Sequence, residues 1–192
     1  IDGVLTPSIQ SLEELDRSIS ETRILIRHWL SVQSGPRDPE KQDLRRLMDV
    51  QIPRQLSGME PLVNAWDQLL RLEFDSLQRD VEYLFLAYAE VIRLLYDFRA
   101  YDDPLAMMEA EYYALDGSSI PSYTTSIRNR MDAMSLAQTD ALTSSTAEMD
   151  ELSNRLKLYA GNVALAILIL GFMIAWAVTR SIVKPIGELK RA

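Results

Sequence analysis

The sequence predicts an all-α protein, namely an up-down antiparallel four-helix bundle with a long last helix that continues into a transmembrane helix. Apolar residues recur with the period of a helix over most of the 192-residue chain, and the alternating pattern of strands is missing. A run of uncharged residues follows at 158–179. We therefore expect a helical domain over 1–157, a membrane helix over 158–179 and a cytoplasmic segment over 180–192.

The first predicted helix begins with Thr6 as its N-cap and Pro7 at its first position, and it extends to about Gln33. Residues 34–39 (SGPRDP) then break it, since glycine and proline cannot continue a helix without cost. One apolar stripe along this helix predicts its buried face: Ile9, Leu12, Leu15, Ile19, Ile26 and Leu30.

The second predicted helix begins at Asp38-Pro39 and extends to about Ser57, with a kink or an early end at Pro53. Residues 57–61 (SGMEP) predict the next break. Because this leaves the second helix short, the turn could instead lie near 73–76.

The third predicted helix spans 61–99 and is the most regular. Its apolar residues are spaced alternately four and three apart, which is the heptad seam of helices packed in bundles: Leu77, Val81, Leu84, Tyr88, Val91, Leu95 and Phe98. A short helix follows from Asp103-Pro104 to about Leu115. The last helix starts near Pro121, and its inner face is marked by Ile127, Met131, Met134, Ala141, Leu152 and Leu156.

The uncharged run at 158–179 is long enough for a helix to cross the hydrocarbon layer, and Tyr159 and Trp176 lie at its ends, where aromatic rings prefer the interface. The alternative is a buried core helix of a soluble protein. Residues 1–157 hold 16 basic and 27 acidic residues, whereas 180–192 hold 4 basic residues and 1 acidic residue.

This charge asymmetry predicts that 180–192 is cytoplasmic and that 1–157 is periplasmic or extracellular. The polar body must then be carried across the bilayer. Since the chain begins with Ile1 and not with methionine, we also expect a first membrane helix just before Ile1 in the intact protein.

The residue types present in the chain exclude several kinds of functional site. The chain has no cysteine and one histidine, His28, which excludes thiolate metal sites and multi-histidine clusters. No glycine-rich phosphate loop or hydrolase motif is present. The acidic body is unsuited to nucleic acid, which needs a basic face. We expect no enzyme activity in this part of the protein, no cofactor and no metal.

Arg23 and Arg27 are four residues apart and therefore share one helix face. Two guanidinium groups on one face can hold a carboxylate or a similar anion, and Trp29 or Trp66 could wall the apolar part of the same ligand. The alternative is a solvated face, with the arginines paired to Glu21 or to acids on a neighbouring helix.

Residues 179–192 (TRSIVKPIGELKRA) resemble the start of a HAMP linker, which joins membrane helices to output modules in bacterial receptors. The resemblance implies that Arg180 and Pro185 stand at the entry to the linker, and that Ile186 and Leu189 occupy its first core positions. The preceding helices are similar to the sensory modules of chemoreceptors and sensor histidine kinases.

These resemblances imply a homodimeric receptor part in an inner bacterial membrane, which binds a small molecule or a ligand-loaded binding protein. From Arg23 and Arg27 we expect the small molecule to be an anion or an organic acid. It would pass a helix displacement through the membrane to a histidine kinase, chemoreceptor or diguanylate cyclase module. The alternative is a membrane-tethered structural or interaction bundle without a ligand.

Overall fold

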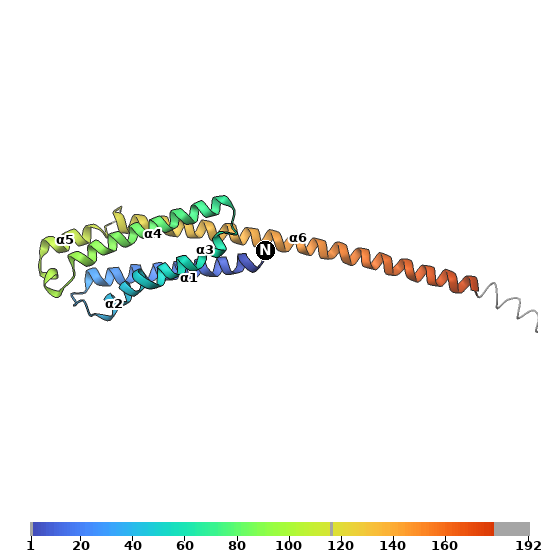
Figure 1. Cartoon of the computed structure of the whole chain (residues 1–192), viewed down its shortest axis with the longest axis horizontal. Helices are drawn as coiled ribbons and strands as arrows, with labels where there is room; N and C mark the ends of the chain where they lie inside the picture. Colours follow the sequence, from blue (N-terminus) through green and yellow to red (C-terminus); the bar gives the residue numbers. More distant parts are fainter. Residues whose placement is uncertain (1, 116, 179–192) are drawn as a thin grey trace, which may run out of the picture. The chain divides into compact units, whose positions relative to one another are not determined.

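The computed structural model describes residues 2–115 and 117–178, and within these ranges the chain forms six α-helices and no strand (Figure 1). The chain divides into two compact units between Leu142 and Thr143. The elements are α1 (Asp2–Ser31), α2 (Pro39–Arg46), a π-helical turn η1 (Leu47–Gln51), α3 (Ile52–Val63), α4 (Gln68–Leu94), a 3₁₀ turn η2 (Phe98–Asp102), α5 (Pro104–Tyr112) and α6 (Ser119–Val178). The all-α prediction is confirmed.

Aspartate side chains cap three of these helices at their starts. Asp38 accepts a hydrogen bond from the backbone N–H of Glu40 in α2, Asp67 caps α4 and Asp103 caps α5. Each carboxylate satisfies a backbone donor that has no partner within the helix. The predicted starts at Asp38-Pro39 and Asp103-Pro104 are therefore confirmed, as is the start near Pro121, which lies in the first turn of α6.

The predicted break at 57–61 is wrong, and so is the alternative near 73–76. Both stretches are helical, and the turn lies between Val63 and the cap residue Asp67. Gly58 is surrounded by open space, so its only cost is the entropic penalty of about 1 kcal/mol that an exposed helix interior tolerates. Pro61 lies in the last turn of α3 and lacks the N–H that would donate to the Ser57 carbonyl, so α3 loses one backbone hydrogen bond there.

The expectations for two other prolines had different outcomes. Pro53 does not end its helix early, since α3 continues to Val63, but the π-helical turn η1 lies directly before α3, and such irregular turns accompany helix kinks. Pro7 does not start the first helix, because α1 already includes Asp2. Proline is tolerated near the amino end of a helix, and Ser8 Oγ donates a hydrogen bond of 2.7 Å to the Val4 carbonyl beside it.

The predicted apolar faces form the core of the first unit. Six of the seven seam positions of the third predicted helix are buried, from Leu77 to Leu95, whereas Phe98 is 56% exposed. Phe98 lies beyond the end of α4, in η2, where the helical register no longer applies. In α6, Ile127, Met131 and Met134 are buried, but Ala141 is exposed.

Hydrogen bonds give the relative direction of α1 and α4. Thr22 of α1 shares a hydrogen bond of 3.4 Å with the Tyr88 hydroxyl, and the indole Nε1 of Trp29 donates to the Leu95 carbonyl. The later residue on α1 contacts the later residue at the end of α4, so α1 and α4 run in the same direction. Figure 1 shows α3 beside α1, and the two helices are in extensive contact.

The part of α6 before Leu142 runs antiparallel to α4. Tyr123 stacks on Tyr83 with ring centroids 5.5 Å apart. Further along α6, Arg130 donates from Nε to Asp80, at 2.9 Å, and from Nη1 to Glu73. As the chain advances along α6, its partners on α4 come earlier in the sequence.

The second unit contains the apolar stretch Leu152–Ala177, which is long and apolar enough to cross a membrane. It begins before the predicted span at 158–179 and therefore also includes Arg155 and Lys157. Apart from the half-buried Ser153, its described side chains are exposed, among them Leu152 and Leu156, which were predicted as inner-face positions. A helix of this length with no protein covering it is suited to a lipid environment.

Candidate anion-binding site

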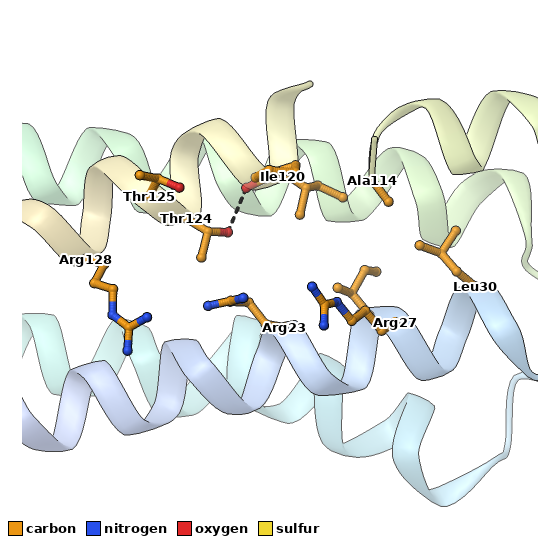
Figure 2. A pocket seen from close by; sticks show the side chains of 10 residues that line it. Arg23, Arg27, Leu30, Ala114, Ile120, Thr124, Thr125 and Arg128 are labelled. Carbon is orange, nitrogen blue, oxygen red and sulfur yellow. Dashed lines mark hydrogen bonds between the residues drawn. The ribbon is translucent and has the colours of Figure 1, made fainter. Parts of the chain in front are cut away.

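A cavity of about 380 Å³ lies between α1 and the first turns of α6. Figure 2 shows Arg23 and Arg27 projecting from α1 toward α6, and Arg128 reaching from α6 toward α1. Arg23 and Arg27 share a face because they are four residues apart on α1. Thr124 and Arg128 share the facing side of α6 for the same reason. Two helices therefore bring three guanidinium groups to one cavity.

The apolar part of the lining comes from aliphatic side chains on the same two helices. Ile26 and Leu30 of α1 and Ile120 of α6 contribute to the wall. Ile26 and Ile120 are buried, whereas Arg23 is half-buried and Arg27 and Arg128 are exposed. The cavity thus has an apolar floor and a charged rim, which suits a small amphipathic anion.

The three arginines bring their positive charges to this cavity from both helices. Among the side chains that the structure describes, no ion pair joins Arg23, Arg27 or Arg128 to an acidic group. Other arginines of the same unit are paired, such as Arg93 with Glu90 and Arg130 with Asp80. The predicted alternative, pairing with Glu21 or a neighbouring acid, does not occur among the described side chains.

Hydroxyl groups lie in the core close to the arginines. Burial raises the pKa of Tyr88 to about 12; hydrogen bonds with Thr22 and Thr124 and the positive charges of Arg23 and Arg27 offset part of this rise. Tyr88 therefore stays neutral at physiological pH. Thr124 Oγ1 donates a hydrogen bond of 2.7 Å to the Ile120 carbonyl, so its hydroxyl proton is used within α6 (Figure 2).

The two tryptophans predicted to complete the site lie elsewhere. Trp29 is fully buried, donates from Nε1 to the Leu95 carbonyl at 3.1 Å, and holds the Lys41 ammonium 4.6 Å from its ring centroid. Trp66 donates from Nε1 to Ser8 Oγ at 3.0 Å. Neither lines the arginine cavity. An indole ring is mostly apolar, so it is more stable in the core than at a polar surface once its N–H has a hydrogen-bond acceptor.

A second cavity, of about 400 Å³, lies in the same unit and includes Trp66. Val4, Leu5 and Leu70 make most of its wall apolar, and the buried side chain of Gln138 also lines it. No basic side chain lines this cavity. It therefore lacks the charge that distinguishes the arginine cavity.

Sequence reasoning identified Arg23 and Arg27 but missed Arg128 and Thr124. The signal was present, since Ile120, Thr124 and Ile127 follow the helical repeat of the predicted inner face of the last helix. The residues expected to pass on a signal, Arg180, Pro185, Ile186 and Leu189, lie outside the described residues.

Comparison with known proteins adds no relative. No protein-family model, no curated protein and no solved structure matches the chain.

Proposed function

We propose that the chain is the ligand-sensing and transmembrane part of a bacterial receptor, of the sensor histidine kinase or methyl-accepting chemoreceptor type. Residues 1–157 form a periplasmic or extracellular up-down four-helix bundle, and 180–192 begin a cytoplasmic HAMP linker. The observation that carries the proposal is the cavity rimmed by Arg23, Arg27 and Arg128, which have no carboxylate partner among the described side chains.

The ligand in this proposal is a small organic acid. A guanidinium group binds a carboxylate through two parallel N–H donors, and three such groups around one cavity favour a ligand with more than one negative charge. The volume of about 380 Å³ falls within the range of small-molecule sites. Ile26, Leu30 and Ile120 would contact its carbon skeleton.

Binding would bias the position of α6 relative to α1, because the arginines come from both helices. Helix α6 carries Thr124 and Arg128 and also contains the apolar stretch Leu152–Ala177. A ligand that prefers one arrangement of α6 would shift the equilibrium between two arrangements, and couplings of about 1–3 kcal/mol are typical. No enzyme activity or cofactor is needed for this step.

Charge supports the proposed orientation. The tail at 180–192 is basic and the body acidic, as the positive-inside rule requires for a cytoplasmic tail. The antiparallel course of α4 and α6, and the parallel course of α1 and α4, support the up-down topology. We propose a homodimer in the membrane, which a ligand-loaded binding protein could also engage.

The test is thermal unfolding of the full chain in detergent, followed by tryptophan fluorescence at constant ionic strength. Acetate, succinate, citrate, nitrate and phosphate are the probes. A ligand present at 100 times its Kd stabilises the folded state by about 2.7 kcal/mol, which corresponds to a rise of about 5–10 °C in Tm for a chain of this size.

The variants Arg27→Gln and Arg128→Gln should each abolish this shift. Arg17→Gln is the matched control, since Arg17 is an exposed arginine of the same helix that does not line the cavity. If no probe raises Tm, or if the shift survives in Arg128→Gln, the anion receptor is wrong and a tethered bundle without a ligand is favoured.

A further inference from the structure

Three ligand-type side chains converge where α1 ends and α2 begins, away from the arginine cavity. His28 of α1 lies beside Asp38 and Glu40, and one donor atom from each lies within 4.8 Å of the others. The His28 Nε2 atom is 3.4 Å from Glu40 Oε2 and 3.9 Å from Asp38 Oδ1. None of the three residues lines the arginine cavity.

The His28 Nε2 atom is shielded from solvent and forms no hydrogen bond. Both neighbouring carboxylates approach it, yet neither accepts a hydrogen bond from it. A polar nitrogen that is shielded from water and lacks a hydrogen bond lowers the stability of the fold, and most such groups in proteins have a partner. An electron-pair acceptor at the centre of the three groups would satisfy the imidazole and both carboxylates at once.

The spacing of the donor atoms fits a bound metal ion. Two ligands about 2.0–2.1 Å from one tetrahedral ion lie about 3.3 Å apart. The two His28 distances, 3.4 and 3.9 Å, are close to this value. Small rotations of the Asp38 and Glu40 side chains would bring all three donors to the ion.

The surrounding backbone positions the Asp38 carboxylate. Asp38 is the N-cap of α2, and its Oδ1 accepts a hydrogen bond of 3.1 Å from the Glu40 N–H. The buried Lys41 donates from Nζ to the Ser34 carbonyl at 2.8 Å, which fixes the preceding loop. Asp38 and the loop before α2 are therefore positioned before a metal binds, which lowers the cost of binding.

We propose that His28, Asp38 and Glu40 form a binding site for a divalent transition metal such as Zn²⁺, with water completing the coordination. One imidazole with two carboxylates suits Zn²⁺, Co²⁺, Ni²⁺ or Cu²⁺, whereas Mg²⁺ and Ca²⁺ prefer oxygen ligands alone. The ion would join the end of α1 to the start of α2. The site does not depend on the proposed receptor function.

The composition of the chain makes the test unambiguous. His28 is the only histidine and there is no cysteine, so any signal from an imidazole bound to a metal must come from His28. The full chain in detergent, purified without a histidine tag, is titrated with ZnCl₂ by calorimetry. Binding of Cu²⁺ is followed in parallel by electron paramagnetic resonance, which detects the nitrogen ligand.

We expect saturable Zn²⁺ binding at one ion per chain and a Cu²⁺ spectrum with one nitrogen ligand. His28→Gln should lose the nitrogen signal and weaken Zn²⁺ binding at least about tenfold. Glu40→Gln, a change at a side chain that is 48% exposed, should also weaken binding at least about tenfold. Asp43→Asn is the matched control, because Asp43 is a half-exposed acid of the same helix that pairs with Arg46.

Absence of saturable Zn²⁺ binding would overturn the proposal. So would equal affinities of the wild type and Glu40→Gln, because the metal would then be held elsewhere. If His28→Gln fails to fold, the Glu40→Gln titration and the nitrogen signal of the wild type decide the question.

Discussion

The indole Nε1 of Trp29 donates a hydrogen bond of 3.1 Å to the carbonyl oxygen of Leu95, which links the last turn of α1 to the end of α4. Leu95 is fully buried and its backbone leaves the helical region, with φ −110° and ψ 42°. Its carbonyl can no longer be paired within α4. The side chain of Trp29 therefore takes the place of a helix cap in the core.

We expect Trp29→Phe to lower the free energy of unfolding by about 1–3 kcal/mol, because the buried Leu95 carbonyl loses its donor while most of the aromatic volume remains. Denaturant unfolding of the full chain in detergent measures the change. Tyr112→Phe is the control, since Tyr112 is 65% exposed. Equal stabilities of Trp29→Phe and the wild type would show that the hydrogen bond contributes nothing.

A second expectation concerns Arg130, which bridges Glu73 and Asp80 of α4 from its position on α6. Hydrogen bonds to these carboxylates, chiefly Asp80, raise the pKa of Arg130. Because the partners are only partly buried, the coupling free energy between Arg130 and Asp80 should be about 0.5–1 kcal/mol. A double-mutant cycle with Arg130→Met and Asp80→Asn measures it.

This coupling should decrease when the salt concentration rises from 0.05 to about 1 M, since salt screens charges that water can reach. The pair of Arg46 and Asp43, which lies within α2, provides a comparison with no contact between helices. A coupling near zero at low salt would mean that the Arg130 network does not hold α6 against α4.

Tyr88 leads to a prediction about alkaline pH. Burial raises its pKa to about 12, above the value of about 10 for an unfolded chain, so the folded state retains the proton longer. The stabilisation is fully present below pH 10 and is lost as the pH rises from 10 to 12. We expect the wild type to lose stability more steeply in this window than Tyr88→Phe.

Denaturant unfolding at several pH values between 9 and about 12 measures the two slopes. Taking the difference between the variants removes the contributions of lysines and of other tyrosines, which both proteins share. Parallel curves for the two proteins would mean that the Tyr88 hydroxyl titrates normally.

Local patterns predicted much of the fold, because they depend on neighbouring residues. The seam from Leu77 to Leu95 and the Asp-Pro starts of α2 and α5 follow from helical periodicity and capping. The turn before α4 was missed because its sequence, Asn64-Ala65-Trp66-Asp67, contains neither glycine nor proline. The sequence signal for this turn is Asp67, the N-cap of α4. It is a weaker indication of a break than Gly58 and Pro61, which nevertheless lie inside α3.

The candidate site was predictable only in part for a different reason. The shared face of Arg23 and Arg27 follows from spacing within one helix. That Arg128 joins them depends on the register between α1 and α6, which tertiary packing sets. The same packing placed Trp29 in the core beneath Lys41, although it stands two residues from Arg27.

The last prediction concerns transmission along α6 and depends on the proposed receptor function. The helix covers Ser119–Val178 and therefore includes both the cavity residues and the apolar stretch. Inserting one alanine at 152–155 turns everything downstream by about 100° relative to the cavity. With the chain fused to a signalling module, this insertion should lock the output on or off while leaving expression and anion binding unchanged.

Inserting seven residues at the same place is the matched control. Seven residues make nearly two full turns, so the downstream face returns to within about 20° of its original direction. The response to the anion should then be largely restored, because a helix that transmits a rotation or tilt depends on its angular phase. If the single insertion leaves ligand-dependent output unchanged, the phase of α6 carries no signal. Loss of output in both insertions would show that the length of this segment, and not its phase, controls the response.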